Sequence, residues 1–172
     1  MLTLTTPTAQ HIKAAETLYL ESFPPEERRP WQMILSPESQ YGPKLQLIIV
    51  DDQFAGMVTT WHFEQFVYIE HLAVNPNVRG RGIGAELLSV LSAQVGKPIV
   101  LEVELPNEAE PMTIRRINFY TRNDFTLLDY DYIQPPYSPE LSEVPLKLMT
   151  TEPALDPELI TKTLHEQVYG VK

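Results

Sequence analysis

The amino-acid sequence predicts an α/β protein in which strands first follow one another and then alternate with helices, giving a mixed sheet. Two observations define this class. Residues 45–74 carry three strand-like runs in succession, rich in β-branched and aromatic residues. Beyond residue 80, helix-like and strand-like segments alternate. With 172 residues and 43% hydrophobic content, the chain suits a single domain, residues 1–172, with a core of its own.

The first 44 residues are expected to hold one short strand, residues 2–5, and two helices. The first helix begins near Pro7, because apolar residues recur at helical spacing at Ile12, Ala15, Leu18 and Tyr19. Pro24 and Pro25 end it. Residues 26–35 are expected to form the second helix, interrupted or restarted at Pro30, and a loop follows.

The remaining elements follow from the same periodicities. Three strands are expected at 45–50, 54–63 and 66–74, the first two joined by a turn at 51–53. The helix expected over 82–95 places its apolar residues on one face, and Gly96 stands where a C-terminal cap belongs. Further strands are expected at 98–105, 125–133 and 144–150, and further helices at 111–122 and 156–168.

Composition narrows the class of protein. The net charge of −10 disfavours nucleic acid or an anionic membrane as the main partner and is compatible with a cationic substrate. The chain has no cysteine, and its four histidines show no metal-ligand spacing, so no metal is expected. The N-terminus lacks a signal-peptide pattern, and the longest apolar run, residues 45–50, is too short to span a bilayer. We therefore expect a cytoplasmic protein.

The segment after the third strand run is rich in glycine. The strand ends at Val74, and a helix begins among Gly80, Gly82 and Gly84. Glycines let the backbone approach a ligand closely, and the N–H groups of a helix's first turn favour an anion. Arg79 and Arg81 add positive charge to an acidic protein. This turn is expected to bind phosphate.

Two phosphate-binding patterns fit this turn. Residues 80–85 satisfy the dinucleotide fingerprint GxGxxG/A, and Glu102 or Glu104 lies about 20 residues further on. In the dinucleotide fold, however, the first glycine follows the strand almost at once, whereas residues 75–79 intervene here. Too few strands of the required type remain beyond the helix.

A second pattern fits better. Arg79-x-x-Gly82-x-Gly84 resembles the (Q/R)-x-x-G-x-(G/A) motif of the GNAT superfamily of N-acetyltransferases. Residues 116–125, Arg-Ile-Asn-Phe-Tyr-x-x-x-Asp-Phe, are similar to that superfamily's A-x-x-F-Y-x-x-x-G-F helix and turn. One helix and one strand separate the two motifs, as in the family. The resemblance implies the GNAT fold, a central and mostly antiparallel sheet flanked by helices, with acetyl-CoA as co-substrate.

The resemblance also assigns the acetyl-CoA contacts. Two strands splay apart in the family, and backbone groups of the first would bond the pantetheine arm at Leu72, Ala73 and Val74. N–H groups would hold the pyrophosphate at Arg79, Gly80, Arg81, Gly82, Ile83, Gly84 and Ala85. Thr113 stands where many members carry an asparagine that touches the pantetheine arm. Arg116 replaces a small alanine, and Asp124 replaces a glycine, a position where Asn123-Asp124 can tolerate a left-handed backbone.

The implied chemistry is direct attack of a primary amine, on a small molecule or peptide, at the thioester carbonyl. Tyr120 matches the family tyrosine that protonates the departing thiolate, and a phenol with a pKa of about 10 is ready to donate. Glu102 and Glu70 are the two candidates for the base or for binding the substrate ammonium, with Glu102 ranked first. Burial would raise the pKa of either carboxyl. Strand alternation places His71 on the face opposite Glu70.

Other functions stay open at this point. A CoA-binding module without turnover is compatible with the departures at Thr113, Arg116 and Asp124. The acceptor amine is not identified, and the oligomeric state, a homodimer included, is undetermined.

Overall fold

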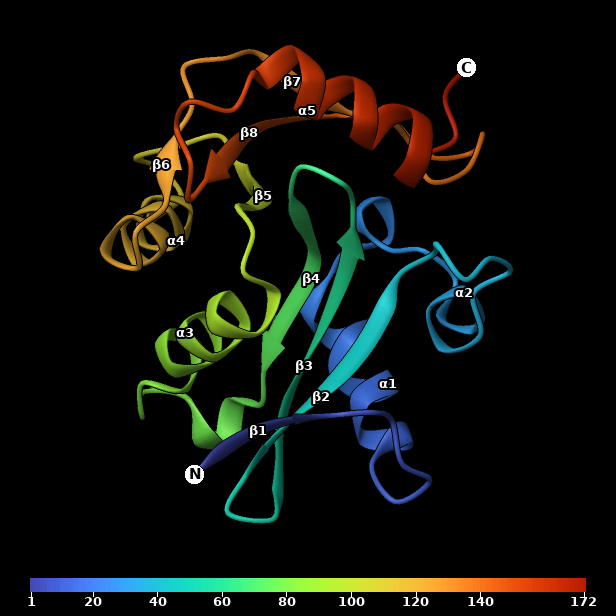
Figure 1. Cartoon of the computed structure of the whole chain (residues 1–172), viewed down its shortest axis with the longest axis vertical. Coiled ribbons are helices and arrows are strands. Elements are labelled where there is room, and N and C mark those ends of the chain that lie inside the picture. Colours follow the sequence, from blue (N-terminus) through green and yellow to red (C-terminus); the bar gives the residue numbers. More distant parts are fainter. The chain divides into compact units, whose positions relative to one another are not determined.

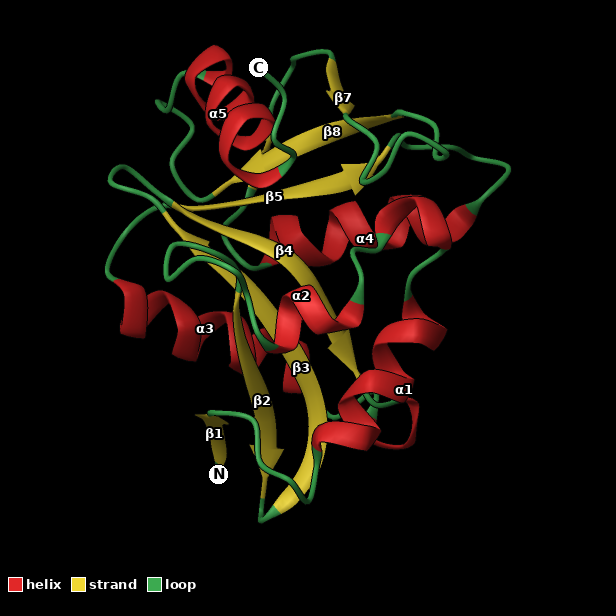
Figure 2. Ribbon diagram, turned by 90° about the vertical axis from the view of Figure 1, so that its right-hand side faces the viewer, coloured by secondary structure: helices red, strands yellow, loops and turns green.

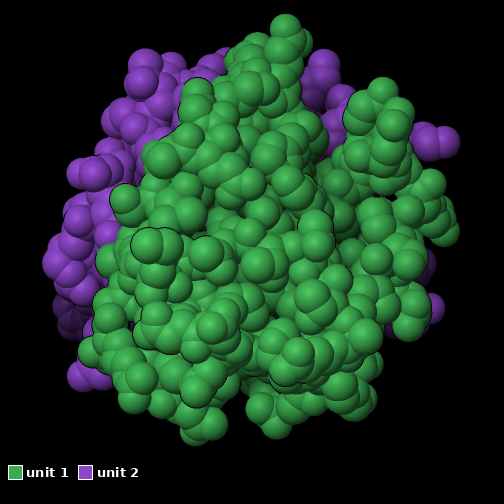
Figure 3. All heavy atoms as spheres, turned by 60° about the horizontal axis from the view of Figure 1, so that its bottom comes forward, with its two compact units in different colours: residues 1–97 green, residues 98–172 purple.

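The computed structural model describes residues 1–172, which divide into two compact units, Met1–Lys97 and Pro98–Lys172 (Figure 3). Each unit has its own strands and helices. That residues 1–172 act as one domain stays a prediction. None of the helices combines the length and apolar character needed to cross a membrane.

Unit 1 contains four antiparallel strands that neighbour one another in chain order (Figure 1). They are β1 (Leu2–Thr5), β2 (Lys44–Val50), β3 (Gln53–His62) and β4 (Val67–Val74). The β2–β3 hairpin closes through Asp51 and Asp52, both with positive φ, +48° and +63°. Two left-handed residues give the turn whose twist matches that of the flanking strands, which explains why this tight connection forms a hairpin.

The helices of unit 1 lie on both faces of these strands. They are α1 (Ile12–Ser22), the 3₁₀ turn η1 (Pro25–Glu27), α2 (Trp31–Leu35), the 3₁₀ turn η2 (Pro76–Val78) and α3 (Ile83–Val95). Figure 2 shows α1 and α3 on opposite sides of the sheet. A core cluster joins α1, α2 and three strands through Ala15, Leu18, Tyr19, Ile34, Leu45, Leu47, Met57 and Ala73.

One predicted helix of this unit divides in two. Residues 26–35 were expected to be helical, with a break at Pro30. In the structure η1 ends at Glu27, Arg28 is extended, and α2 begins at Trp31. Proline disfavours helical backbone at the residue before it, so the chain must stay extended ahead of Pro30 and can restart a helix only beyond it.

Unit 2 is built around β8 (Val144–Thr150), which pairs antiparallel with three strands. These are β5 (Ile99–Glu104), β6 (Thr126–Leu127) and β7 (Tyr132–Gln134). Its helices are α4 (Pro111–Arg122) and α5 (Pro157–Thr163), the latter continued by a π-helical turn, η3 (Leu164–Val168). Figure 2 shows α4 and α5 on opposite sides of the β5–β8 pair.

The prediction of one strand over residues 125–133 is wrong. Leu127 pairs with Met149 and Tyr132 with Leu146, so this segment advances five residues while β8 advances three. The two extra residues cannot stay in the ladder, and the chain bulges out between β6 and β7.

Candidate active site

The glycine turn is held in place by its own polar contacts. The Asn75 side chain accepts from the Asn77 N–H at 3.1 Å, and Arg79 Nε donates to the Val74 carbonyl at 3.1 Å. Gly80 and Gly82 have φ of +80° and +74°, and a Cβ on either would meet nothing within 4 Å. Glycine is therefore needed for its left-handed backbone rather than for lack of room for a side chain.

The three residues expected to contact the pantetheine arm, Leu72 to Val74, end β4 and pair with residues 56–58 of β3. Gly56 lies opposite Val74, and a Cβ there would come within 2.3 Å of the Ala73 carbonyl oxygen. Only glycine allows this close approach. Sequence reasoning did not single out Gly56, although a glycine inside a strand is itself a signal of close backbone approach.

β4 carries an irregularity that changes the face on which Glu70 lies. Thr59 pairs with His71 and Thr60 with Ile69, so Glu70 is the extra residue of a β-bulge. Strict alternation predicted Glu70 and His71 on opposite faces, and that prediction is wrong. The bulge interrupts the two-residue period, and His71 Nδ1 lies 3.9 Å from a Glu70 carboxylate oxygen.

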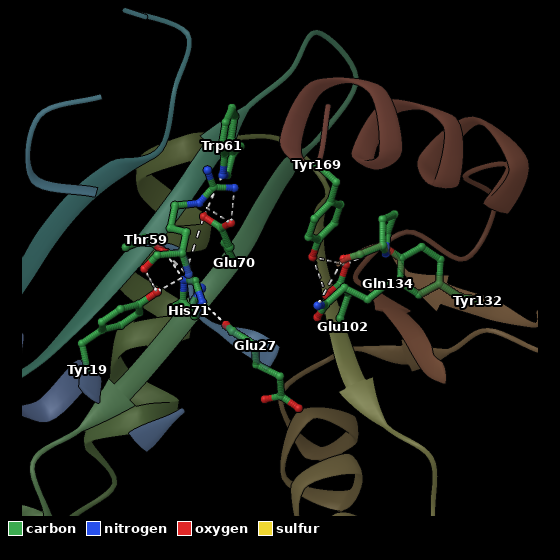
Figure 4. Close-up of polar contacts among 12 residues, drawn as sticks. Tyr19, Glu27, Thr59, Trp61, Glu70, His71, Glu102, Tyr132, Gln134 and Tyr169 are labelled. Atoms are coloured by element: carbon green, nitrogen blue, oxygen red, sulfur yellow. Dashed lines mark hydrogen bonds and ion pairs between the residues drawn. The ribbon is translucent and has the colours of Figure 1, made fainter. Parts of the chain in front are cut away.

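The Glu70 carboxylate is fully buried and paired (Figure 4). Arg29 donates to it from Nε at 2.9 Å and from a terminal nitrogen at 2.7 Å, and the Trp61 indole N–H donates at 2.9 Å. Burial alone would raise the pKa of Glu70, but the charge and hydrogen bonds of Arg29, with His71 and Trp61, bring this pKa below its ordinary value. The predicted increase is therefore wrong for Glu70, which is held as an ion.

Both ring nitrogens of His71 also make polar contacts. Its Nε2 donates to the Glu27 carbonyl at 2.8 Å, and its Nδ1 lies 3.2 Å from the Thr59 hydroxyl. Burial lowers the pKa of this histidine, against the opposing effect of Glu70. Through His71 and Arg29, β4 holds the segment that connects α1 to α2.

In unit 2, Tyr120 lies on α4 with its ring between Phe119 and Phe125, at centroid distances of 5.2 and 5.5 Å. Burial raises the pKa of this phenol to about 12, with smaller opposing effects of Arg116 and Glu104. The hydroxyl makes no hydrogen bond within the protein, and since no fully buried side-chain oxygen lacks a partner, it must reach solvent. It is a protonated donor with nothing in the protein to donate to.

The departures from the family motif have local explanations. Arg116 forms an exposed ion pair with Glu104. Asp124 has a φ of +68°, which confirms the left-handed backbone expected where the family carries glycine. The Thr113 hydroxyl accepts from the Asn107 N–H at 2.9 Å and donates to the Glu110 carbonyl at 2.8 Å, so it orders the start of α4.

Glu102 lies on β5 and is held by two phenols (Figure 4). The Tyr132 hydroxyl donates to one carboxylate oxygen at 2.5 Å, and the Tyr169 hydroxyl lies 2.9 and 3.0 Å from the two oxygens. Burial, and next the charge of Glu102, raise the pKa of Tyr132, which therefore stays a donor. Sequence reasoning missed both tyrosines, because neither falls on a motif. Tyr132 lies 30 residues and Tyr169 lies 67 residues beyond Glu102 in the sequence.

No group of three or more His, Asp or Glu side chains is arranged to hold a metal ion. A hollow of about 500 Å³ in unit 1 is lined mainly by residues 34–45, and none of the predicted site residues takes part in it.

Comparison with known proteins identifies the family. The model of the acetyltransferase (GNAT) family matches residues 10–125. A protein of the GNAT family from Bacteroides thetaiotaomicron, known from a solved structure, is 42% identical with a TM-score of 0.88, and the match covers 100% of this chain and 99% of that one. YjbC of Bacillus subtilis (strain 168), named as an acetyltransferase, is 38% identical over 63 residues, which are 37% of this chain and 32% of that protein.

A more distant structure shares the fold alone. Arabidopsis thaliana Naa50, solved in complex with the bisubstrate analogue CoA-Ac-MVNAL, is 21% identical with a TM-score of 0.60 over 88% of this chain and 98% of its own. With the glycine turn, the Tyr120 helix and the fold in agreement, the chain belongs to the GNAT family of acetyltransferases, enzymes that transfer the acyl group of acetyl-CoA.

Proposed function

We propose that the protein is an N-acetyltransferase that passes the acetyl group of acetyl-CoA to a primary amine of a small molecule or peptide, and that residues 1–172 act as one domain. The observation that carries the proposal is Tyr120, a protonated phenol without a partner in the protein, on the second motif of the family. A cytoplasmic location and the absence of nucleic-acid and membrane partners stay predictions from composition.

The glycine turn would bind the phosphates of acetyl-CoA. Its left-handed glycines lead the chain into the 13-residue helix α3, whose first N–H groups and dipole favour an anion. Arg79 donates a hydrogen bond to the Val74 carbonyl, and both Arg79 and Arg81 are exposed, so their charges would add to the attraction for phosphate. Leu72 to Val74 would bond the pantetheine arm through backbone groups, in a position that Gly56 sets.

The reaction is direct transfer. The amine nitrogen attacks the thioester carbonyl carbon, the C–S bond breaks, and the Tyr120 hydroxyl gives its proton to the departing sulfur. A pKa of about 12 keeps this hydroxyl protonated until the thiolate forms. The proton that the amine loses goes to a carboxylate, directly or through water, and the contacts favour Glu102 over Glu70 for that role.

The two glutamates differ in what holds them. Arg29 neutralises Glu70 and lowers its pKa, so Glu70 is a poor proton acceptor whose pairing holds the α1–α2 connection. Glu102 accepts hydrogen bonds from the phenol hydroxyls of Tyr132 and Tyr169, which orient its carboxylate. We therefore assign Glu102 to the acceptor amine and Glu70 to positioning.

The test is release of free CoA thiol from acetyl-CoA in the presence of single amines, including diamines and short peptides with a free α-amino group. A peptide acceptor is included because Naa50 was solved with a CoA–peptide analogue. The same compounds acetylated beforehand serve as controls and should release none. Thiol release with at least one free amine supports the proposal, whereas acetyl-CoA binding without release for any of them would favour a CoA-binding module.

A further inference from the structure

The hollow of about 500 Å³ beside α2 has no part in the proposed reaction. It lies where the chain passes from α2 through the loop of residues 36–43 into β2, on the right of Figure 1. Its volume falls within the range of small-molecule sites, roughly 300–1,000 Å³. Most of its wall is apolar and comes from Pro7, Ile34, Leu35, Pro37, Pro43 and Leu45. The hollow therefore suits a small molecule with an apolar body.

The loop of residues 36–43 folds back on itself and holds one wall of the hollow in shape. The Gly42 N–H donates to the Ser39 carbonyl at 2.9 Å, and the Tyr41 N–H donates to the Ser39 hydroxyl at 3.1 Å. A Cβ on Gly42 would come within 2.7 Å of the Pro37 Cβ, so glycine permits this close approach. Tyr41 lines the hollow and is 78% exposed, which leaves its ring with room to pack against a ligand.

The titratable groups in the wall of the hollow are basic, although the net charge of the protein is −10. Lys44 and His62 line it, and no Asp or Glu does. The Lys44 ammonium forms no hydrogen bond or ion pair with the protein. Lys44 pairs with Thr60 across β2 and β3, and the Thr60 hydroxyl lies 3.1 Å from His62 Nε2. Paired residues and residues two apart on a strand share a face, so Lys44 and His62 lie on the same side of the sheet.

The charge of these groups sets the charge of the ligand. Burial, and next the positive charges of Lys44 and Lys97, lower the pKa of His62, so its ring is neutral at pH 7. A neutral imidazole keeps one N–H for donation. Lys44 is then the one full charge in the wall of the hollow, and it attracts a ligand with a single negative charge.

We propose that this hollow binds a small carboxylate with an apolar body, with the carboxylate at Lys44 and His62 and the body between α2 and Tyr41. A carboxylate carries one charge and two acceptor oxygens, which match one ammonium and one imidazole N–H. The inference goes beyond the proposed function, because none of the residues assigned to acetyl-CoA or to the transfer lines the hollow.

The test measures binding of phenylacetate by NMR titration in the absence of acetyl-CoA, with phenylacetamide as the uncharged analogue of the same shape. Wild-type protein should bind phenylacetate about tenfold more tightly than phenylacetamide, as expected for a hydrogen bond to a charged group. Lys44→Gln should weaken phenylacetate binding about tenfold and leave phenylacetamide unchanged. Tyr41→Ala removes the ring that both probes contact and should weaken the two by a similar factor.

Lys13→Gln is the matched control. It removes the same charge from an exposed lysine of α1 that lies outside the hollow, and it should change neither affinity. The titration also locates the ligand. Phenylacetate should shift the ring resonances of His62 but not those of His11, which stacks on Phe54 near the opposite end of β3.

A melting curve confirms that each variant is folded before its affinities are compared. Wild-type protein that binds neither probe, or that binds both equally, would overturn the inference, and so would a folded Lys44→Gln protein that keeps the preference for phenylacetate. Binding without a shift at His62 would overturn it as well. Titration of wild-type protein with CoA tests the proposed function separately, because the residues assigned to CoA lie outside the hollow.

Discussion

Tyr120 combines a ring fixed between two phenylalanines with a hydroxyl that has no partner in the protein. Tyr120→Phe keeps the ring and removes the acid, so kcat should fall by ~10²–10⁴-fold while acetyl-CoA affinity stays nearly unchanged. The measurement is kcat and the acetyl-CoA Kd on one preparation, with a melting curve. Tyr130→Phe, a loss of hydroxyl in the same unit outside the site, should leave kcat unchanged. Unchanged kcat in stable Tyr120→Phe protein removes this residue from the mechanism.

The surroundings of Glu70 reverse the effect that burial has on the pKa of its carboxyl group. Its folded-state pKa lies below the ordinary value of 4.5 because of Arg29, so its ionised form stabilises the fold above about pH 4.5. This contribution is lost as the pH falls through the folded-state pKa. Glu70→Gln leaves a buried guanidinium without a counter-charge and should cost about 3–5 kcal/mol of unfolding free energy at neutral pH.

The measurement is the melting temperature of wild type and Glu70→Gln from pH 7 to pH 3. The difference between the two proteins should be largest at neutral pH and shrink as the pH falls from 4.5 through the lower folded-state pKa, below which wild-type Glu70 is also uncharged. A difference that stays constant over this range would show that the Arg29–Glu70 charge pair does not contribute as described.

At the level of elements, α3 offers a matched test of the phosphate site, because glycines with left-handed backbone stand at both ends of it. Gly82 precedes the helix with φ of +74°, and Gly96 follows it with φ of +58°, each with open space where a Cβ would go. Glutamate at either position carries the same charge and similar backbone strain, roughly 1–2 kcal/mol. Only Gly82→Glu puts a carboxylate where the phosphates need bare N–H groups.

Gly82→Glu should therefore abolish CoA binding, whereas Gly96→Glu should lose similar stability and keep it. Isothermal titration with CoA, after a melting curve for each variant, makes the comparison. Equal CoA affinity in the two folded variants would place the phosphates somewhere other than the start of α3.

Elements with a single strong sequence periodicity were predicted well. Features that depend on how one strand pairs with another were not. The ranges of β1, α4 and β8 were predicted to the residue, because Pro111 and the apolar alternation of β8 are local signals. The bulge at Glu70 and the interruption between β6 and β7 arise from the pairing register with another strand. Register depends on which residues the partner offers, which no local pattern contains.

For the whole molecule, the sequence was sufficient for the family and for the left-handed backbone at the glycine turn and at Asp124, because this geometry follows from residue type. The roles of the residues on the two motifs stay predictions. The sequence was insufficient to predict the contacts that Arg29 makes with Glu70 and that Tyr132 and Tyr169 make with Glu102. These side chains meet their glutamates from 30 to 67 residues away, and Tyr169 directly follows the π turn that ends the last helix. Long-range contacts of this kind require the folded chain.

The central claim is that the whole chain binds acetyl-CoA at the family's site. Ligand that binds only the folded state raises the free energy of unfolding, by about 2.7 kcal/mol at 100 times its dissociation constant. The measurement is denaturant unfolding with acetyl-CoA, CoA or NADH at matched concentrations. Acetyl-CoA and CoA should stabilise the protein by about this amount near that saturation, and NADH should not. No stabilisation by acetyl-CoA, alongside clear stabilisation by NADH, would contradict the account.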